Sequence, residues 1–423
     1  MDPGLLNSDA GPDFLNAKVK IDGVMWAGCV EMHLKSSDWF LHGHDRDVAY
    51  ENVVLHVCET VDGEVKTLSG RRPPQVVMEI PKAVRESFSQ LMEAHATPPC
   101  RKIVSSMHEL KLHSWLSALQ AERLEQKTEA LLRRVSQSEG SWEAACFATL
   151  ARGYGFGVNG EAFEMWAHHI PLTAAAHHRD DLFQVEALFM GQAGLLQPEA
   201  IPERYREQAL TDDYFIRLRN EYAFLAHKFH LEPMDHGMWK FLRLRPQNFP
   251  HIRLSQLANL YHSRRADLSQ LVAQESLKDV RRQLTTGVST YWETHFIFGA
   301  ESLKSKKTLS ESSKRLLIIN AIVPLLFAYG RHRGDEKLCF RAFDLLEQLP
   351  PEDNVIIRSW AQSGLEAHNA GDSQALVQLQ KNYCNKKDCL RCRIGYEYLS
   401  SPLKSKNPYN AISLLAEEHP EEL

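Results

Sequence analysis

Two acidic residues and a histidine near the N-terminus have the types and spacing of a metal-assisted hydrolytic site. Asp13 follows Pro12 at the start of one predicted strand, while Glu31 and His33 lie two residues apart on the next. Residues two apart on a strand project from the same face. Adjacent strands lie about 4.8 Å apart, so Asp13 and Glu31 can reach one cation. Two carboxylates placed in this way suit Mg²⁺ or Mn²⁺, which would activate a bound water for hydrolysis.

The pairing of the two carboxylates depends on the hairpin that joins their strands. A two-residue turn at Asp22-Gly23 would set Phe14 opposite Glu31. A three-residue loop with a bulge would shift the register by one residue and set Asp13 opposite Glu31. The sequence leaves both registers open.

Several further polar residues follow the two acids. Lys35 lies on the same strand face as Glu31 and His33, and we include it among the catalytic candidates. Weaker candidates follow within the next 25 residues: His42, His44, Asp47 and His56. In the alternative interpretation the acids face solvent on a plain hairpin, and His56 is a hydrogen-bonded core histidine.

Three cysteines near the C-terminus predict a second metal site. Cys384, Cys389 and Cys392 follow the spacing Cys-x4-Cys-x2-Cys, with lysines and arginines between them. Two thiolates spaced in this way can bind one tetrahedral ion, so we expect zinc or an iron–sulfur cluster. The fourth ligand would be Cys339, a histidine or a cysteine from the N-terminal region. The alternative is three packed thiols in a loop that ends a helix.

A basic and aromatic run over residues 239–253 is the best candidate for contact with nucleic acid. Such a composition can bind phosphates and stack bases. The candidate contacts are Lys240, Arg243, Arg245 and Arg253. The alternative is a buried loop whose arginines pair with acids. The glycine-rich segment 153–157 lies between helical segments, so we interpret it as a tight connection and not as a phosphate-binding fingerprint.

The elements that must position these residues change character near residue 100. Alternating and compact apolar runs predict strands over 17–21, 24–35 and 53–58, with a second hairpin turn at Asp62-Gly63. Beyond residue 100 the apolar residues follow a helical period, most clearly in a long amphipathic helix over 112–135. We therefore expect an α+β protein, with a mixed-sheet domain over residues 1–100 and a larger all-helical domain over residues 101–423 that ends in the cysteine motif.

Composition and charge place the chain among ordinary folded proteins. It has 423 residues, of which 43% are hydrophobic and 24% are charged, and its net charge of −5 excludes a global basic field. The first hundred residues are acidic, with 9 Lys and Arg against 15 Asp and Glu. No stretch approaches the roughly 20 uninterrupted apolar residues of a membrane span, and no secretion signal precedes the eight cysteines. These features predict a cytoplasmic protein with no membrane association, and they leave protein partners and oligomeric state open.

The N-terminal region resembles the PD-(D/E)xK nuclease superfamily. Pro12, Asp13 and Glu31 match its pattern, and His33 stands where the family carries lysine. Residues 38–57 look like the very-short-patch-repair branch of that superfamily. The resemblance implies a restriction-endonuclease-like fold and Mg²⁺- or Mn²⁺-dependent hydrolysis of phosphodiester bonds in nucleic acid. His33 would then stabilise the leaving charge, orient the water or bind the metal. The alternative function is a non-catalytic module that keeps the fold to bind nucleic acid or a protein.

The chain as a whole resembles an uncharacterised bacterial family of unknown function. The likeness runs almost from end to end, and it supplies no activity. The motifs that carry it are the segments 9–14, 28–33, 37–39, 186–189, 245–250, 372–375 and 383–395.

Overall fold

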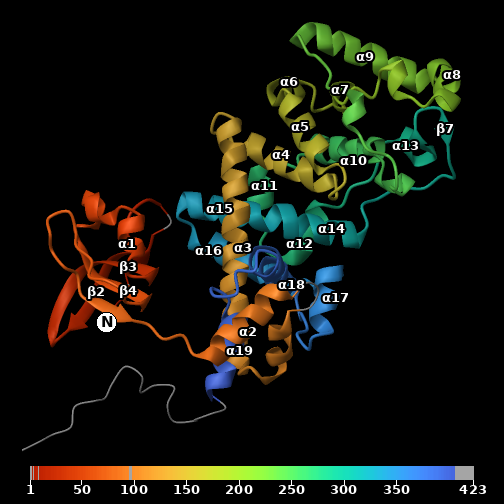
Figure 1. Ribbon diagram of the computed structural model, residues 1–423. Helices are drawn as coiled ribbons and strands as arrows, with labels where there is room; N and C mark the ends of the chain where they lie inside the picture. The colour runs from red at the N-terminus through yellow and green to blue at the C-terminus, as the bar shows by residue number, and fades with distance from the viewer. Residues whose placement is uncertain (1, 3, 8, 95–97, 405–423) are drawn as a thin grey trace, which may run out of the picture. The chain divides into compact units, whose positions relative to one another are not determined.

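The computed structural model describes residues 2, 4–7, 9–94 and 98–404, and shows an α+β protein (Figure 1). A mixed five-stranded sheet near the N-terminus is followed by mostly helical regions, as the sequence predicts. The chain divides into two compact units. Unit 1 comprises Met1–Ile103 and Cys389–Leu423, and unit 2 comprises Val104–Asp388.

The sheet of unit 1 has its strands in chain order. The strands are β1 (Leu5–Leu6), β2 (Phe14–Ile21), β3 (Val24–Lys35), β4 (Val53–Thr60) and β5 (Gln75–Val77). β2 is antiparallel to both β1 and β3, whereas β4 is parallel to β3 and β5 is parallel to β4. The prediction of a second hairpin at Asp62-Gly63 is therefore wrong. Asp62 instead accepts hydrogen bonds from the backbone amide of Ser37 and the hydroxyl of Ser36, both at 2.9 Å, and this fastens the loop after β4 to the end of β3.

A two-residue turn and a bulge together set the register of the first hairpin. Asp22 and Gly23 both have positive φ, and Ile21 pairs with Val24. Primed turns of this kind match the twist of a two-stranded hairpin. The register then shifts between Phe14 and Ala17, where Asn16 has a φ of 58°. The bulge, not the turn, changes the register, so that Phe14 pairs with Val30.

Short helices connect β3 to β4 and cover a small core. They are α1 (Asp38–Leu41) and two single 3₁₀ turns, η1 (His44–Arg46) and η2 (Val48–Tyr50). Trp39 is fully buried and packs with Cys29, Tyr50 and Val53. The Trp39 indole N–H donates to the carbonyl of Lys66 at 2.9 Å. The packing of this core holds the segment between β3 and β4 against these two strands.

Two distant segments complete unit 1. Helix α2 (Lys82–Glu93) packs against α19 (Arg393–Lys404), and the 3₁₀ segment η3 (Pro99–Ser106) follows α2 in the chain. The hydroxyl of Tyr398 donates to Gln90 Oε1 at 2.9 Å. The last helix of the described chain therefore packs on α2, which lies about 300 residues earlier in the sequence.

Unit 2 is helical around one large apolar core. The long amphipathic helix predicted from the sequence is confirmed as α3. The helices are α3 (Glu109–Gln137), α4 (Trp142–Tyr154), α5 (Gly160–His169), α6 (Leu172–His177), α7 (Leu182–Gln192), η4 (Pro198–Ala200), α8 (Glu203–Thr211), α9 (Asp213–Phe229), η5 (His236–Met238), η6 (Pro246–Asn248), α10 (Pro250–His262), α11 (Leu268–Val272), α12 (Leu277–Gln283), α13 (Thr290–Thr294), α14 (Glu311–Leu317), η7 (Ile318–Ile322), α15 (Val323–Arg333), α16 (Glu336–Gln348), α17 (Val355–Ala361), α18 (Ala370–Gln378) and η8 (Leu379–Cys384). Unit 2 also contains a two-stranded antiparallel ribbon, formed by β6 (His295–Ile297) and β7 (Ala300–Glu301).

One helical stretch of unit 2 is long and apolar enough to cross a membrane. It runs over Glu311–Arg333, and most of its residues are buried inside the protein. The core helix of a folded domain has the same length and composition, so this stretch is weak evidence for a membrane span.

Candidate metal centre

Asp13 and Glu31 lie opposite each other on neighbouring strands of unit 1. The backbone amide of Asp13 donates to Glu31 Oε2 at 3.1 Å. The backbone amide of Met32 donates to Asp13 Oδ2 at 2.9 Å. These bonds exist because the bulge at Asn16 removes Phe14 from the position opposite Glu31. Each carboxylate is therefore held by a main-chain group of the other strand.

Burial makes Glu31 an unusual carboxylate. The residue is only 5% exposed, and burial followed by the nearby charge of Asp13 raises its pKa from 4.5 to about 7. A buried anion next to another anion is unfavourable without a positive partner. A bound cation would supply such a partner and would lower the pKa of Glu31 again.

Three histidines converge beside Glu31. The metal-binding atoms of His33, His42 and His44 all lie within 4.8 Å of one another. Glu31 Oε1 lies 3.2 Å from His44 Nε2 and 3.6 Å from His33 Nε2. His33 Nε2 also lies 3.1 Å from His42 Nδ1. Four of the candidate residues from the sequence therefore lie close together: Glu31, His33, His42 and His44.

The loop after α1 directs two of these imidazoles toward β3. Gly43 has a φ of 76°, a left-handed conformation that glycine adopts without strain, and it reverses the chain between His42 and His44. The His44 ring stacks on Tyr50, with 3.7 Å between ring centroids. The edge of Trp39 packs against the same imidazole. Aromatic packing of this kind fixes the orientation of the ring.

A fourth histidine lies behind His33. His56 on β4 is fully buried, and its Nε2 lies 2.8 Å from His33 Nδ1. Cys58 Sγ lies 3.4 Å from the same His56 nitrogen. His56 thus restrains the orientation of the His33 ring, as second-layer groups do for ligating histidines. Cys58 had not been singled out, although its place two residues after His56 on a strand is a signal that it shares that face.

The electrostatics of the cluster suit a metal. Burial and the neighbouring imidazoles lower the pKa of His44 and of His56 to about 4, and the same causes lower the pKa of His33. The His44 ring is therefore neutral near pH 7 and keeps a lone pair for a cation. His44 Nε2 is buried and makes no hydrogen bond within the described part of the chain. The donor set fits a metal ion.

Two other candidates, Lys35 and Asp47, have contacts of a different kind. Lys35 is exposed, and its backbone amide donates to Asp38 Oδ2 at 3.0 Å. Asp47 accepts from the amide of Ala49 at 2.9 Å and so caps η2. A capping role accounts for Asp47 without any contact to a ligand.

The basic and aromatic run is partly buried. Lys240, Arg243 and Arg245 are exposed. Arg253 lies on α10, is only 5% exposed, and donates to Gln256 Oε1 at 2.8 Å. Its guanidinium therefore faces protein and not solvent.

The predicted cysteine site is divided between the units. Cys384 ends η8 in unit 2, whereas Cys389 and Cys392 form a turn in unit 1, where the amide of Cys392 donates to the carbonyl of Cys389 at 3.3 Å. Both lie near enough to Cys100 to add to the effect of burial, which raises the pKa of that thiol to about 12. Gly395 packs so closely on this turn that a Cβ there would lie 2.2 Å from the Cys389 carbonyl. Cys339, the other predicted fourth ligand, lies on α16 and contacts the carbonyl of Phe327.

The family model described as "Protein of unknown function (DUF2851)" matches residues 1–355. The chain belongs to this family. No curated protein and no solved structure matches it. The matched residues include the whole histidine and carboxylate cluster, whereas the three C-terminal cysteines lie beyond the match.

Proposed function

We propose that this protein is a metal-dependent nuclease that hydrolyses phosphodiester bonds in nucleic acid at the Asp13 and Glu31 cluster. The observation that carries the proposal is the convergence of three imidazoles within 4.8 Å, with the buried Glu31 carboxylate in contact with two of them. The hydrogen bond from the Asp13 amide to Glu31, at the start of the β2–β3 pairing, also supports the proposal.

The donor set favours one kind of ion. Mg²⁺ prefers oxygen ligands and retains water, whereas imidazole suits transition metals. His33, His42 and His44 would hold the ion together with Glu31, and Asp13 lies beside them. We therefore expect Mn²⁺ or another transition ion to bind more tightly than Mg²⁺. Such an ion activates a bound water and neutralises charge on the phosphoryl oxygens.

The surrounding residues have distinct roles in this proposal. His33 takes the place of the usual lysine, and its Nδ1 contact with His56 leaves Nε2 directed toward Glu31. Tyr50 and Trp39 hold the His44 ring in place. Lys35, exposed at the end of β3, is available to contact a phosphate of the substrate.

The test uses the full chain stripped of metal and then reloaded. Purified protein is incubated with DNA or RNA in the presence of Mn²⁺, Zn²⁺ or Mg²⁺, and metal content is measured in parallel. We expect cleavage with Mn²⁺ and its loss in Glu31→Gln. The matched control is Glu64→Gln, because Glu64 is exposed and pairs with Arg72 at the surface. Cleavage that persists in folded Glu31→Gln protein would refute the proposal.

The same experiment detects the alternative function. Binding of nucleic acid that weakens with salt, without cleavage and without bound metal, would favour a non-catalytic module that keeps a nuclease-like fold. The exposed Lys240, Arg243 and Arg245 are the contacts to test by substitution in that case.

We further propose that the C-terminal cysteines bind zinc in a structural role. Cys100, Cys389 and Cys392 supply three thiols within unit 1. Sulfur ligands in a Cys-x2-Cys turn are typical of closed zinc sites. An iron–sulfur cluster on the same thiols would be recognised by its visible absorption.

A further inference from the structure

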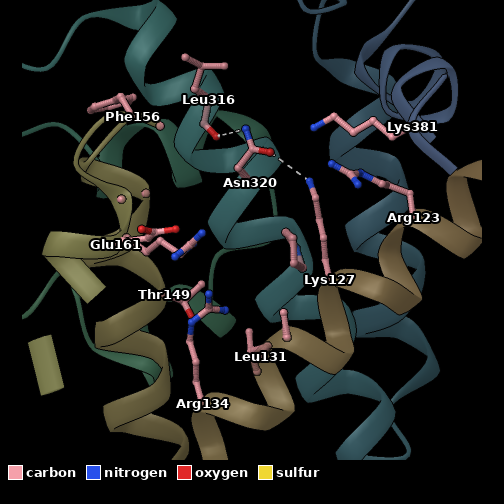
Figure 2. Close-up of a pocket in the computed structure, with 16 residues that line it drawn as sticks. Arg123, Lys127, Leu131, Arg134, Thr149, Phe156, Glu161, Leu316, Asn320 and Lys381 are labelled. Atoms are coloured by element: carbon pink, nitrogen blue, oxygen red, sulfur yellow. Dashed lines mark hydrogen bonds between the residues drawn. The ribbon is translucent and has the colours of Figure 1, made fainter. Parts of the chain in front are cut away.

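A solvent-open cavity of about 620 Å³ lies within unit 2, and none of the residues that line it is a proposed metal ligand (Figure 2). Its walls come from α3, α4, the start of α5, the stretch from α14 to α15, and η8. Cavities of 300–1,000 Å³ accommodate small organic ligands. Five cationic side chains line it: Arg123, Lys127, Arg134, Arg152 and Lys381.

Lys127 is the central cation of this cavity. Its ammonium group donates to Asn320 Oδ1 at 3.1 Å (Figure 2). It also donates to Gln374 Oε1 at 2.7 Å and to the carbonyl of Ile319 at 3.3 Å. All three acceptors are neutral. Lys127 is half-buried, so its charge is desolvated, and no carboxylate of the described residues forms an ion pair with it. An anion in the cavity would supply the missing negative charge.

Two more cations lie near Lys127. Arg123 is one turn earlier on α3, and its Nε donates to the same Gln374 oxygen at 3.4 Å. Lys381 extends from η8 and is exposed (Figure 2). The negative charge of Glu352 acts on both Arg123 and Lys127, but its carboxylate already accepts from Gln374. Two of the three positive groups therefore share one acid, and that acid does not line the cavity.

The opposite wall carries the remaining charges. Arg134 and Arg152 both pair with Glu164, which offsets one of the two positive charges. Glu161 is the acid that lines the cavity itself. The cations therefore outnumber the acids, and the cavity has a net positive field.

A glycine-rich turn and an aromatic ring form the end of the cavity nearest α5. Gly153, Phe156 and Gly157 line the cavity, and a Cβ at Gly155 would lie 2.4 Å from the amide of Gly160. The turn therefore lies directly on the start of α5. The guanidinium of Arg253 lies over the Phe156 ring, 4.5 Å from its centre, and so holds the ring in place.

The first turn of α5 adds to the positive field. Its preceding residue, Asn159, makes no side-chain cap, because the amide of that side chain bonds to the backbone of Lys240 at 2.8 Å. The amides of Gly160 and Glu161 belong to residues that line the cavity. Helix N-termini of this kind favour negative ligands.

We propose that this cavity binds a nucleoside phosphate. The phosphate would lie against Arg123, Lys127 and Lys381, and the base would lie toward Phe156. The same chemistry is offered by a free nucleotide and by the phosphorylated end of a nucleic-acid strand. The proposal does not depend on the metal centre, because all of the residues that carry it belong to unit 2.

The experiment is calorimetric titration of the full chain, kept in a chelator so that no metal is bound. The probes are inorganic phosphate, AMP, and a short single-stranded oligonucleotide with or without a 5′ phosphate. We expect AMP to bind with one site per chain and more tightly than phosphate. Tighter binding of the phosphorylated oligonucleotide than of AMP would identify a strand end as the ligand, and the reverse would identify a free nucleotide.

Two substitutions test the two ends of the cavity. Lys381→Gln should weaken AMP binding about tenfold, the effect of one charged hydrogen bond. Phe156→Leu should reduce AMP affinity to that of inorganic phosphate, because the base loses its aromatic contact. Lys337→Gln is the matched control, since Lys337 is exposed on α16 and does not line the cavity. Melting temperatures confirm that each variant is folded.

Three results would overturn the proposal. The first is no binding of any probe at millimolar concentration. The second is wild-type affinity in both Lys381→Gln and Phe156→Leu. The third is an equal loss in Lys337→Gln, which would indicate non-specific attraction of anions to surface charge.

Discussion

The backbone amide of Asp13 donates to the carboxylate of Glu31, which lies directly opposite it on the neighbouring strand. The amide that follows Glu31 returns a bond to Asp13. This reciprocal arrangement places two acids side by side, one of them buried, and it exists only in the register that the bulge at Asn16 produces. The arrangement of the metal centre therefore depends on a residue that belongs to no candidate site.

A substitution at the bulge should abolish metal binding without touching a ligand. Asn16 has a φ of 58°, which a β-branched residue adopts poorly. In Asn16→Val the left-handed conformation costs about 1–2 kcal/mol more, and the regular ladder would place Phe14 opposite Glu31. We expect at least a tenfold loss of Mn²⁺ affinity, measured by calorimetry. Asn16→Gly should bind as the wild type does, and an unaffected Asn16→Val would show that the bulge does not control the site.

Removing the buried acid should change how stability depends on pH in the metal-free protein. The folded state holds a proton on Glu31 up to pH about 7, whereas the unfolded chain releases it near 4.5. The folded state therefore binds more protons between these values, and wild-type stability falls relative to Glu31→Gln as pH rises from 5 to 8. The difference should reach at most ~3 kcal/mol.

Urea unfolding with a chelator present measures this difference at each pH. The histidines are common to both proteins, so their own titration largely cancels. A constant difference across the range would mean that Glu31 is ionised throughout.

Anion binding in the cavity of unit 2 should tighten as pH falls. Burial, together with the charges of Arg123 and Lys381, lowers the pKa of Lys127 to about 7 against the opposing effect of Glu352. An anion favours the charged ammonium, so binding takes up a proton near neutral pH. Sulfate, which stays doubly charged throughout, should bind more tightly at pH 6 than at pH 8.5. Calorimetry in two buffers of different ionisation enthalpy measures the number of protons taken up on binding. Lys127→Met should abolish this proton uptake.

The cysteine site should lose its metal when a residue far from the sequence motif is changed. Cys100 lies 289 residues before Cys389 in the chain, yet the two are close in unit 1. We expect Cys100→Ser to lower zinc content, measured by elemental analysis, from one equivalent to less than 0.1 equivalent (about a tenfold loss of the kind seen when a ligand is removed). Cys339→Ser is the control, because Cys339 packs on α15 instead. Equal zinc in the wild type and in Cys100→Ser would exclude Cys100 as a ligand.

The elements of the fold were predictable where the signal is local. The Asp22-Gly23 turn, the strand that begins at Val53 and the long helix α3 follow from turn residues and from the period of apolar side chains. The parallel pairing of β4 with β5 was missed, because an Asp-Gly pair also suits a loop fastened by serine hydroxyls.

The candidate centre was predictable in its residues but not in its geometry. Proximity in sequence brought His42 and His44 to attention, but their approach to His33 depends on the left-handed Gly43 and on packing against Trp39 and Tyr50. The cavity of unit 2 was not foreseen, because its cations come from segments separated by more than 250 residues.

The pairing of α2 with α19 has a consequence for how the protein is made. Gln90 and Tyr398 are 308 residues apart, so the ribosome must synthesise all of unit 2 before the partner of α2 exists. Contacts of such long sequence separation form slowly, because a long loop has to close first. The side of α2 that packs on α19 therefore lacks its partner helix during most of translation.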